Sequence, residues 1–210
     1  MDFLKPLYYF EGVQEKYHKI LAVNHIWEAI DKIEGYVKEE TRREKVIIGK
    51  NTRISEKAEI EGPCVIGDDC DIRPGAYLRE NVIIGNNCVI RSELKNCLIM
   101  DNSNAAHLSY VGDSILGRNC NLGAGTILSN LKLDEKPIIL RINDNDYNTG
   151  LQKFGAILGD NVHTGSNALT NPGTLIGKNS FLYPNAAIKG FFPANSIIKL
   201  KQELEVVKKR

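Results

Sequence analysis

The sequence predicts a mainly β fold of the solenoid kind, in which short strands wind into stacked coils. The first observation behind this prediction is an aliphatic residue that recurs every six residues. Its first run comprises Ile48, Ile54, Ile60, Ile66, Ile72, Leu78, Ile84 and Ile90. Neither the 3.6-residue period of a helix nor the two-residue alternation of a strand gives this spacing. A six-residue unit is typical of solenoids, whose stacked coils each bury one strip of side chains.

Smaller side chains and glycines complete the repeat. Four residues after the aliphatic positions come Thr52, Ala58, Cys64, Cys70, Ala76, Val82 and Cys88, until Leu94 breaks the series. Glycine directly follows several aliphatic residues, as in Ile66-Gly67 and Ile84-Gly85, with Asn or Asp soon after. These residue types tolerate the positive φ of tight corners. We therefore expect an aliphatic interior and tight corners in every coil.

The segment 1–45 has a helical period instead. Its apolar residues at helical spacing are Val13, Tyr17, Ile20 and Leu21, followed by Ile26, Ile30, Ile33 and Val37. Asn24 lies between the two groups and is a residue type that caps helices. Because the terminal repeats of a solenoid need a cap, we expect a helical hairpin or bent helix that covers the first coil.

Interruptions of the repeat divide the chain. The repeat falters over 92–96 and is lost from about 131 to 156, before Leu158, Thr164, Thr170, Ile176, Leu182 and Ile188 recover it. We expect a helical cap over 1–45, a β-helix over 46–198 with an inserted loop at about 131–156, and a basic tail over 199–210. Interruptions of a solenoid map to surface loops, often at the binding face.

Charge and cysteine usage exclude several classes of protein. Lys and Arg number 27 against 26 Asp and Glu, a net charge of +1, which does not favour nucleic acid or an acidic membrane as partner. Neither a signal peptide nor an apolar run of membrane-spanning length is recognisable, so we expect a cytoplasmic protein. Cys64, Cys70, Cys88 and Cys120 occupy small positions of the repeat and are expected to be buried, reduced thiols. No CxxC or HxxxH spacing occurs, and no metal site is expected.

Polar residues gather where the repeat is disturbed. They are Glu93, Lys95, His107, Tyr110, Asn121, Asn130 and Lys136. His107 lies 14 residues after Glu93 and 14 before Asn121, a spacing that places the three on one face of stacked coils. A carboxylate beside a histidine orients the imidazole as a general base, and the Lys, Tyr and Asn side chains suit a phosphorylated, hydroxyl-rich substrate.

A structural reading of the same residues stays open. A single histidine in a domain is more often structural than catalytic, and Glu93 with Lys95 is compatible with an ordinary surface ion pair. His18 and His25 fall in the helical segment and are read as structural. The sequence does not separate a loop role from a surface role for His163.

At this point a family resemblance becomes specific. The stretch SELKNCLIMDNSNAAHLSYVGDSILGRNCNLGAGTILSN resembles the acetyltransferase domain of bifunctional N-acetylglucosamine-1-phosphate uridyltransferase/glucosamine-1-phosphate acetyltransferases. The later segment NTGLQKFGAILGDNVHTGSNALTNPG is more similar to archaeal-type sugar-1-phosphate nucleotidyltransferase/acetyltransferases. The pair HLSYVGD and NLGAGT discriminates better than the hexapeptide repeat, which many acyltransferases share. The resemblance implies a left-handed parallel β-helix and a homotrimer with active sites between subunits.

The resemblance also assigns roles to residues. It implies that His107 is the general base that takes a proton from the 2-amino group of the sugar, and that Glu93 orients His107. It places Lys95, Tyr110, Asn121 and Lys136 in contact with the sugar and its phosphate, and Asn130 at the edge of the site near an oxyanion-stabilising backbone N–H. The phosphate-binding arginine is Arg79 by the string AYLRE or Arg73 by the string RPG. Ala124 and Ser166 align near the acetyl-CoA arm.

The resemblance has limits. Leu131 follows Asn130 where the bacterial enzymes have an aromatic residue, so we expect different contacts at that edge. The uridyltransferase domain of the family is not recognisable in the chain, so a separate uridyltransferase is the expected pathway partner.

The expected function is acetyl-CoA-dependent N-acetylation of glucosamine-1-phosphate, or a close amino-sugar 1-phosphate, for UDP-N-acetylglucosamine synthesis. A non-catalytic scaffold and an acyltransferase of another acceptor remain as alternatives. A metal-dependent carbonic anhydrase is disfavoured, because it needs three convergent histidines and the predicted β-helix contains only His107 and His163.

Overall fold

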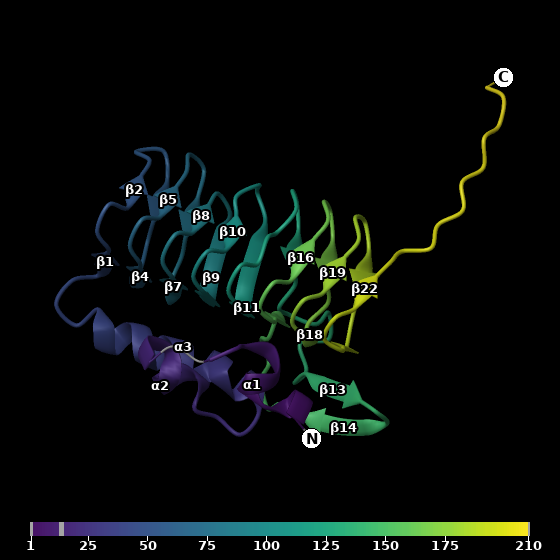
Figure 1. Ribbon diagram of the computed structural model, residues 1–210, viewed down its shortest axis with the longest axis horizontal. Helices are drawn as coiled ribbons and strands as arrows, with labels where there is room; N and C mark the ends of the chain where they lie inside the picture. The colour runs from purple at the N-terminus through teal and green to yellow at the C-terminus, as the bar shows by residue number, and fades with distance from the viewer. Residues whose placement is uncertain (1, 13–14, 210) are drawn as a thin grey trace.

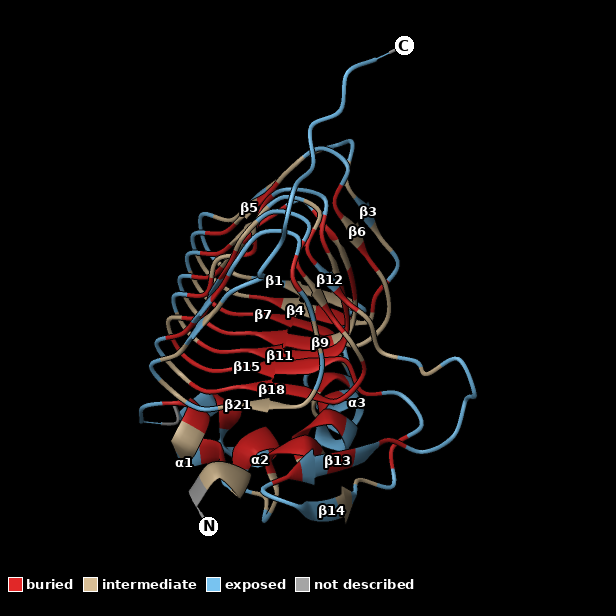
Figure 2. Ribbon diagram, turned by 90° about the vertical axis from the view of Figure 1, so that its right-hand side faces the viewer, coloured by how far each residue is buried: buried red, intermediate tan, exposed pale blue. Residues whose placement is uncertain are grey.

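The computed structural model describes residues 2–12 and 15–209 and confirms a solenoid of parallel strands (Figure 1). Val13, part of the predicted helical pattern, lies outside the described residues. The coils are roughly triangular in section, so the solenoid has three faces (Figure 2).

We name the faces the covered face, the second face and the third face. The covered face contains β1 (Val46–Ile48), β4 (Cys64–Ile66), β7 (Val82–Ile84), β9 (Glu93–Ile99), β11 (Tyr110–Leu116), β15 (Ala156–Leu158), β18 (Thr174–Ile176) and β21 (Phe191–Phe192). The second face contains β2 (Arg53–Ile54), β5 (Asp71–Ile72), β8 (Val89–Ile90), β10 (Asn104–Ala105), β16 (His163–Thr164), β19 (Phe181–Leu182) and β22 (Ile197–Ile198). The third face contains β3 (Glu59–Ile60), β6 (Tyr77–Leu78), the first residues of β9 and β11, β12 (Ile127–Leu128), β17 (Leu169–Thr170) and β20 (Ala187–Ile188).

The register of the strands reproduces the six-residue repeat. Val46 pairs with Cys64, and Cys64 pairs with Val82, so one full coil is 18 residues or three repeat units. The aliphatic positions fill the interior, where Ile66, Ile84 and Ile90 are at most 1% exposed. Asparagine and aspartate occupy corners at positive φ and stack on their equivalents in the next coil, as the predicted corner chemistry requires.

The cysteines are buried, as expected from their place in the repeat, and the thiols of Cys64 and Cys120 are poor nucleophiles. All five are buried and free. Burial raises the pKa of Cys64 to about 11, and burial is also the main reason that the pKa of Cys120 rises to about 12. A thiol with so high a pKa is a poor nucleophile at neutral pH.

The N-terminal segment is helical, but its position differs from the expected one. It forms η1 (Asp2–Leu4), α1 (Pro6–Tyr9), η2 (Glu15–Tyr17), α2 (His18–Leu21), η3 (Ile26–Glu28) and α3 (Ala29–Glu40). These helices lie along the covered face, with α3 against β4, β7, β9 and β11, and not over the end of the first coil (Figures 1 and 2). Asn24 caps no helix; its side chain accepts a hydrogen bond from Lys5.

The outer side of the covered face explains this position. Ile83, Leu98, Ile115, Ile157 and Leu175 point outward from successive strands and are at most 2% exposed. They pack with helix residues such as Ile30 and Ile33 in a second core, separate from the interior of the solenoid. Burial of such a strip stabilises the docked helices by about 25 cal/mol per Å² of apolar surface.

The non-repetitive stretch is more ordered than a loop. It contains a hairpin of β13 (Ile139–Ile142) and β14 (Asn145–Asn148), and buries Leu140, Ile142 and Phe154 against the helical layer. The segments 131–137 and 149–155 on either side of the hairpin form no strand or helix, and Leu133 in the first of them is fully exposed. The tail over 199–209 is extended and exposed, and it leads away from the last coil (Figure 1).

Candidate functional site

One shortened corner interrupts the otherwise regular third face. Between the second and third faces, four residues separate Ile72 from Tyr77, but only two separate Ile90 from Glu93. The missing residues leave a hollow of about 420 Å³ between neighbouring full-length corners. Gly75, Ser92, Glu93, Leu108, Tyr110 and Gly125 are among the residues that line it. Concave sites with a few convergent polar groups are where ligands bind.

Two predicted site residues face each other across adjacent strands of this hollow. Glu93 at the start of β9 pairs in register with Tyr110 at the start of β11. Burial raises the pKa of Tyr110, and the nearby carboxylates of Asp113 and Glu93 raise it further. The Tyr110 hydroxyl therefore stays neutral at physiological pH and is a hydrogen-bond donor.

A network of charges continues from Glu93. Arg79 donates from Nη1 to Glu93 Oε1 at 3.1 Å, and its Nε lies 3.7 Å from Glu80 Oε2. Lys95 Nζ lies 3.5 Å from Glu80 Oε1. Burial alone would raise the pKa of Glu80, but its own backbone N–H, Lys95 and Arg79 lower it overall. Each of the two cations thus has a carboxylate partner in this chain, and an anionic ligand would have to compete with that partner.

Sequence reasoning missed Glu80, because an acid after Arg79 in the string LREN looks like any surface residue. Arg73, the other candidate for phosphate binding, lies elsewhere. Its Nε donates to Asp71 Oδ2 at 2.8 Å at the end of the second face. Of the two arginines, only Arg79 therefore contacts another predicted site residue.

His107 lies at the full-length corner next to the hollow, and its side chain is exposed. Its carbonyl oxygen accepts from Gly125 N at 3.0 Å, and the carbonyl of Ala124 accepts from Asn167 N at 2.7 Å. The carbonyl of Ser166 in turn accepts from Asn185 N at 3.0 Å. His107, Ala124 and Ser166 thus form a column along one edge of the solenoid, one above another in successive coils.

Glu93 and His107 do not form the expected pair within this chain. The Glu93 carboxylate bonds to Arg79, and no hydrogen bond joins it to His107 among the described residues. The register gives the reason, because Glu93 pairs with Tyr110 and His107 precedes Tyr110 by three residues at the corner.

Asn130 joins the far side of the cluster. It follows β12, and its side-chain amide donates to the carboxylate of Asp113. A Cβ on Gly112 would lie 2.5 Å from the Tyr110 hydroxyl and 2.7 Å from Asn130 Nδ2, so both groups pack directly over Gly112. Only glycine leaves them this room.

The remaining predicted residues lie apart from the hollow. Asn121 bridges Asn104 and His163 on the second face, and so it is not on the face that holds Glu93. Lys136 lies in the exposed segment 131–137, where its backbone N–H donates to Asp134. The segment leaves the solenoid beside the third face (Figure 2). A single copy of the chain therefore brings together Arg79, Glu93, Lys95, Tyr110 and Asn130, with His107 at the neighbouring corner.

Two further histidines contact aromatic rings away from the hollow. His25 bonds to Glu28 and stacks on Trp27 at a ring distance of 4.7 Å. His163 lies beside Phe181 on the second face, with ring centroids 5.6 Å apart. Among the described residues, no three His, Cys, Asp or Glu side chains are grouped to hold a metal. The helices described are too short or too polar to cross a membrane.

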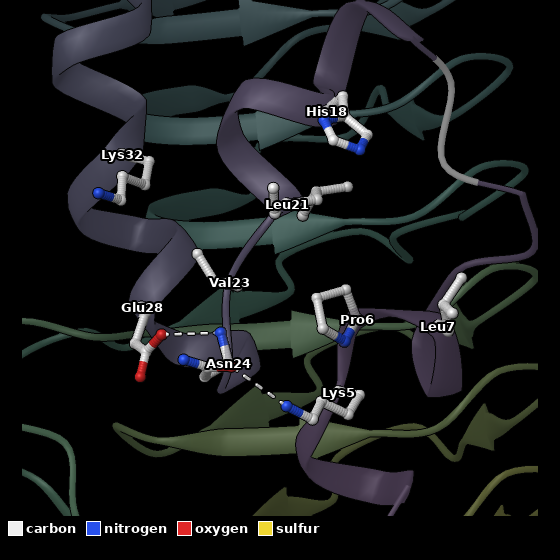
Figure 3. Close-up of a pocket in the computed structure, with 10 residues that line it drawn as sticks. Lys5, Pro6, Leu7, His18, Leu21, Val23, Asn24, Glu28 and Lys32 are labelled. Carbon is white, nitrogen blue, oxygen red and sulfur yellow. Dashed lines mark hydrogen bonds between the residues drawn. The ribbon is translucent and has the colours of Figure 1, made fainter.

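The molecule also has a groove of about 710 Å³ between the N-terminal helices (Figure 3). Its lining includes Lys5, His18, Leu21, Val23 and Glu28, and none of the predicted catalytic or substrate-binding residues. The groove and the hollow are thus separate features, and of the polar set at the repeat breaks Glu93 and Tyr110 line the hollow.

The stacked six-residue repeats, interrupted at one corner by a polar hollow, define a protein of the hexapeptide-repeat acyltransferase superfamily. The model of bacterial transferase hexapeptide repeats matches residues 45–80. The chain belongs to the family described as the GMPPB C-terminal domain, whose model matches residues 69–198.

Curated relatives agree with this assignment. Over 139 residues the chain is 42% identical to the bifunctional protein GlmU of Methanococcus aeolicus, covering 66% of this chain and 33% of that protein. It is 38% identical to the bifunctional sugar-1-phosphate nucleotidylyltransferase/acetyltransferase of Sulfurisphaera tokodaii, covering 64% of this chain and 39% of that protein. The chain thus spans about a third of the length of these bifunctional relatives.

A relative of more similar length is the putative uncharacterized acetyltransferase YaiX of Escherichia coli. It is 34% identical over 162 residues, which cover 76% of this chain and 70% of that protein.

Proposed function

We propose that the chain transfers the acetyl group of acetyl-CoA to the 2-amino group of an amino-sugar 1-phosphate, with glucosamine-1-phosphate as the substrate. The observation that supports this most is the shortened corner. It opens a hollow lined in part by Glu93 and Tyr110, beside Arg79 and an exposed imidazole at the next corner. The names of the GlmU and nucleotidylyltransferase/acetyltransferase relatives support the same reaction class and substrate type.

The proposed step is an acyl transfer with His107 as general base. His107 accepts a proton from the substrate amine as the nitrogen attacks the thioester carbonyl carbon. The new C–N bond forms, the C–S bond breaks, and coenzyme A leaves as the thiolate, which takes up a proton. The column of His107, Ala124 and Ser166 suits an extended cofactor arm that lies along the edge of the solenoid.

The charge network supports recognition of a phosphate. Arg79 is bound to Glu93, which lines the hollow, and Lys95 is bound to Glu80. A sugar phosphate would displace Glu80 or Glu93 from them and form charge-assisted hydrogen bonds in their place.

We further propose a cytoplasmic homotrimer in which a neighbouring copy completes each site. Asn121 on the second face and Lys136 on the projecting segment lie away from the hollow of their own chain. A parallel neighbour packed against the third face would offer both residues a route to it. A separate protein would supply the uridylyl transfer that leads to UDP-N-acetylglucosamine.

Coenzyme A release from acetyl-CoA tests the proposal. The acceptors would be glucosamine-1-phosphate, galactosamine-1-phosphate, glucosamine-6-phosphate and unphosphorylated glucosamine. We expect turnover with one or both 1-phosphates and much less with the other two. The mass of the protein in solution, measured in parallel, should be that of a trimer.

A second candidate function follows from the same charge network. Because Arg79 and Lys95 already have carboxylate partners, the hollow is close to neutral and fits a non-catalytic scaffold or an acceptor without a phosphate. A folded protein without turnover on any of the four acceptors would favour the scaffold. Turnover on unphosphorylated glucosamine alone would favour another acceptor.

A further inference from the structure

The structure contains a buried carboxylate at the edge of the hollow that the proposed reaction does not use. Asp113 is only 5% exposed and lies in β11, three residues after Tyr110. Its φ of +45° places it at the corner where β11 passes from the third face to the covered face. A buried carboxylate is costly unless its oxygens are hydrogen-bonded.

Each oxygen of Asp113 has a side-chain amide as donor. Asn96 Nδ2 donates to Oδ1 at 2.8 Å from the coil before, and Asn130 Nδ2 donates to Oδ2 from the end of β12. The bond to Asn96 belongs to an ordinary corner stack, because Asn96 has a similar positive φ of +43°. The bond to Asn130 is different, since Asn130 lies at the edge of the hollow and not at the corner.

The bond to Asp113 fixes which way round the Asn130 amide lies. A carboxylate accepts hydrogen bonds and does not donate them, so the Asn130 nitrogen must face Asp113. Its carbonyl oxygen must then point elsewhere. The same nitrogen lies beside the Tyr110 hydroxyl, because both are within 2.7 Å of a single point above Gly112. A hydrogen bond from Asn130 also lowers the pKa of Tyr110 against the larger effect of burial.

This arrangement sets the direction of the hydrogen bonds offered to a ligand. Because Asn130 turns its nitrogen and not its oxygen to this point, it offers the Tyr110 O–H no acceptor, and that O–H is free to donate to a ligand. On the basis of the proposed function, we infer that Asp113 is a positioning residue for the sugar site. Through Asn130 it makes Tyr110 a hydrogen-bond donor and the Asn130 carbonyl an acceptor toward a substrate hydroxyl or amide.

Replacement of Asp113 by Asn keeps the size of the side chain but removes one of the two oxygens that accept hydrogen bonds from Asn96 and Asn130. Asn has one acceptor and one donor, so it cannot accept from both Asn96 and Asn130. The partner that meets the new NH2 group, Asn96 or Asn130, has to turn its oxygen toward it; where that partner is Asn130, its oxygen and nitrogen exchange places and both Asn130 and Tyr110 present the wrong groups to the substrate. For D113N we expect a 10- to 100-fold higher KM for the amino-sugar phosphate, with the KM for acetyl-CoA within about 2-fold of wild type.

Asp160 provides a matched control. It is also a buried aspartate, 3% exposed, and accepts from the Arg118 side chain and two backbone N–H groups. D160N should lower stability, as D113N does, without the selective change in KM for the sugar. If D113N and D160N change the KM for the amino-sugar phosphate equally, Asp113 has only a structural role and the inference is wrong.

A double variant tests whether the effect passes through Asn130. In the N130A background, D113N should change the KM for the sugar by less than about 2-fold, because the group that it positions is gone. A full 10- to 100-fold further change in that background would overturn the inference.

A measurement without substrate separates this inference from the proposed function. The side-chain amide protons of Asn130, observed by NMR, should exchange with water faster in D113N than in wild type and D160N. Wild type without acetyl transfer would contradict the proposed reaction. If the Asn130 amide protons exchange faster in D113N alone, the positioning role still holds. If the Asn130 amide protons exchange with water as slowly in D113N as in wild type, the positioning role is wrong, whatever the activity.

Discussion

Glu93 and Tyr110 pair in register on adjacent parallel strands, directly beside the one corner that is two residues shorter than its neighbours. This pairing determines the arrangement of the site. It places Arg79 on Glu93, Asn130 next to Tyr110, and His107 at the next corner. The polar hollow thus exists because one coil of a regular solenoid omits part of its corner.

Arg79, and not Arg73, is predicted to bind the substrate phosphate. R79A should raise the KM for the amino-sugar 1-phosphate by about 10- to 100-fold, because it removes charge-assisted hydrogen bonds worth about 1.5–3 kcal/mol. R73A is the matched control, since Arg73 bonds to Asp71 at the end of the second face and should leave this KM unchanged. Steady-state kinetics with varied sugar phosphate distinguishes the two. A raised KM in R73A alone would reverse the assignment.

Gly112 is predicted to be essential for the geometry of the site although it has no side chain. A methyl group at this position would meet the ends of the Tyr110 and Asn130 side chains at 2.5 and 2.7 Å. These ends can move, so G112A should fold but lose about 100-fold in kcat/KM, as displaced catalytic groups do.

Gly35 in α3 supplies the control for this substitution. A Cβ on Gly35 meets no atom within 4 Å. G35A should therefore keep full activity and stabilise the protein by about 0.5–1 kcal/mol through helix propensity. Wild-type kcat/KM in G112A would contradict the packing described for Tyr110 and Asn130.

The docking of the N-terminal helices predicts a loss of stability at high pH. Tyr17 is 2% exposed, and its hydroxyl donates to Asp101 of the solenoid at 3.1 Å. Burial, and then the Asp101 carboxylate, raise the pKa of Tyr17 far above its usual value. The contribution of Tyr17 is fully present below the unfolded pKa of about 10 and is lost as pH rises above it, by about 1.4 kcal/mol per pH unit.

Denaturant unfolding between pH 9 and 11.5 measures this loss. Y17F should show a shallower fall of the unfolding free energy above pH 10 than wild type. The exposed Tyr183 is the control, and Y183F should follow wild type. Identical slopes for Y17F and wild type would contradict a buried Tyr17 at the junction of helices and solenoid.

The fold was predictable for the periodic solenoid, and less so for the helices and the hairpin that pack on its covered face. The six-residue period marks the interior of the coils, and the structure confirms it from Ile66 onward, while Ile48 in the first coil is 50% exposed. The position of the helices depends on outward residues such as Leu98 and Ile115, which lie within apolar strands and do not stand out from inward ones. The hairpin over 139–148 was missed because its pattern differs from the repeat that surrounds it.

The candidate site was predictable in composition and only partly in geometry. Glu93 and Tyr110 meet, but equal spacings of 14 residues did not place Asn121 with them, because paired strands are 15 to 18 residues apart, or 42 where the inserted segment lies between them. Glu80 and Asp113 escaped notice, since only three-dimensional contacts distinguish an acid that binds two site residues from an acid on the surface.

The central claim is acetyl transfer with His107 as base, and the rate of coenzyme A release by H107A tests it most directly. His107 is exposed, so its replacement should not alter the thermal unfolding midpoint or the oligomeric state. With glucosamine-1-phosphate and acetyl-CoA, kcat of H107A should fall by about 10²- to 10⁴-fold. H163A, which alters an exposed histidine on the second face, should retain wild-type kcat. Wild-type turnover by H107A would contradict the account.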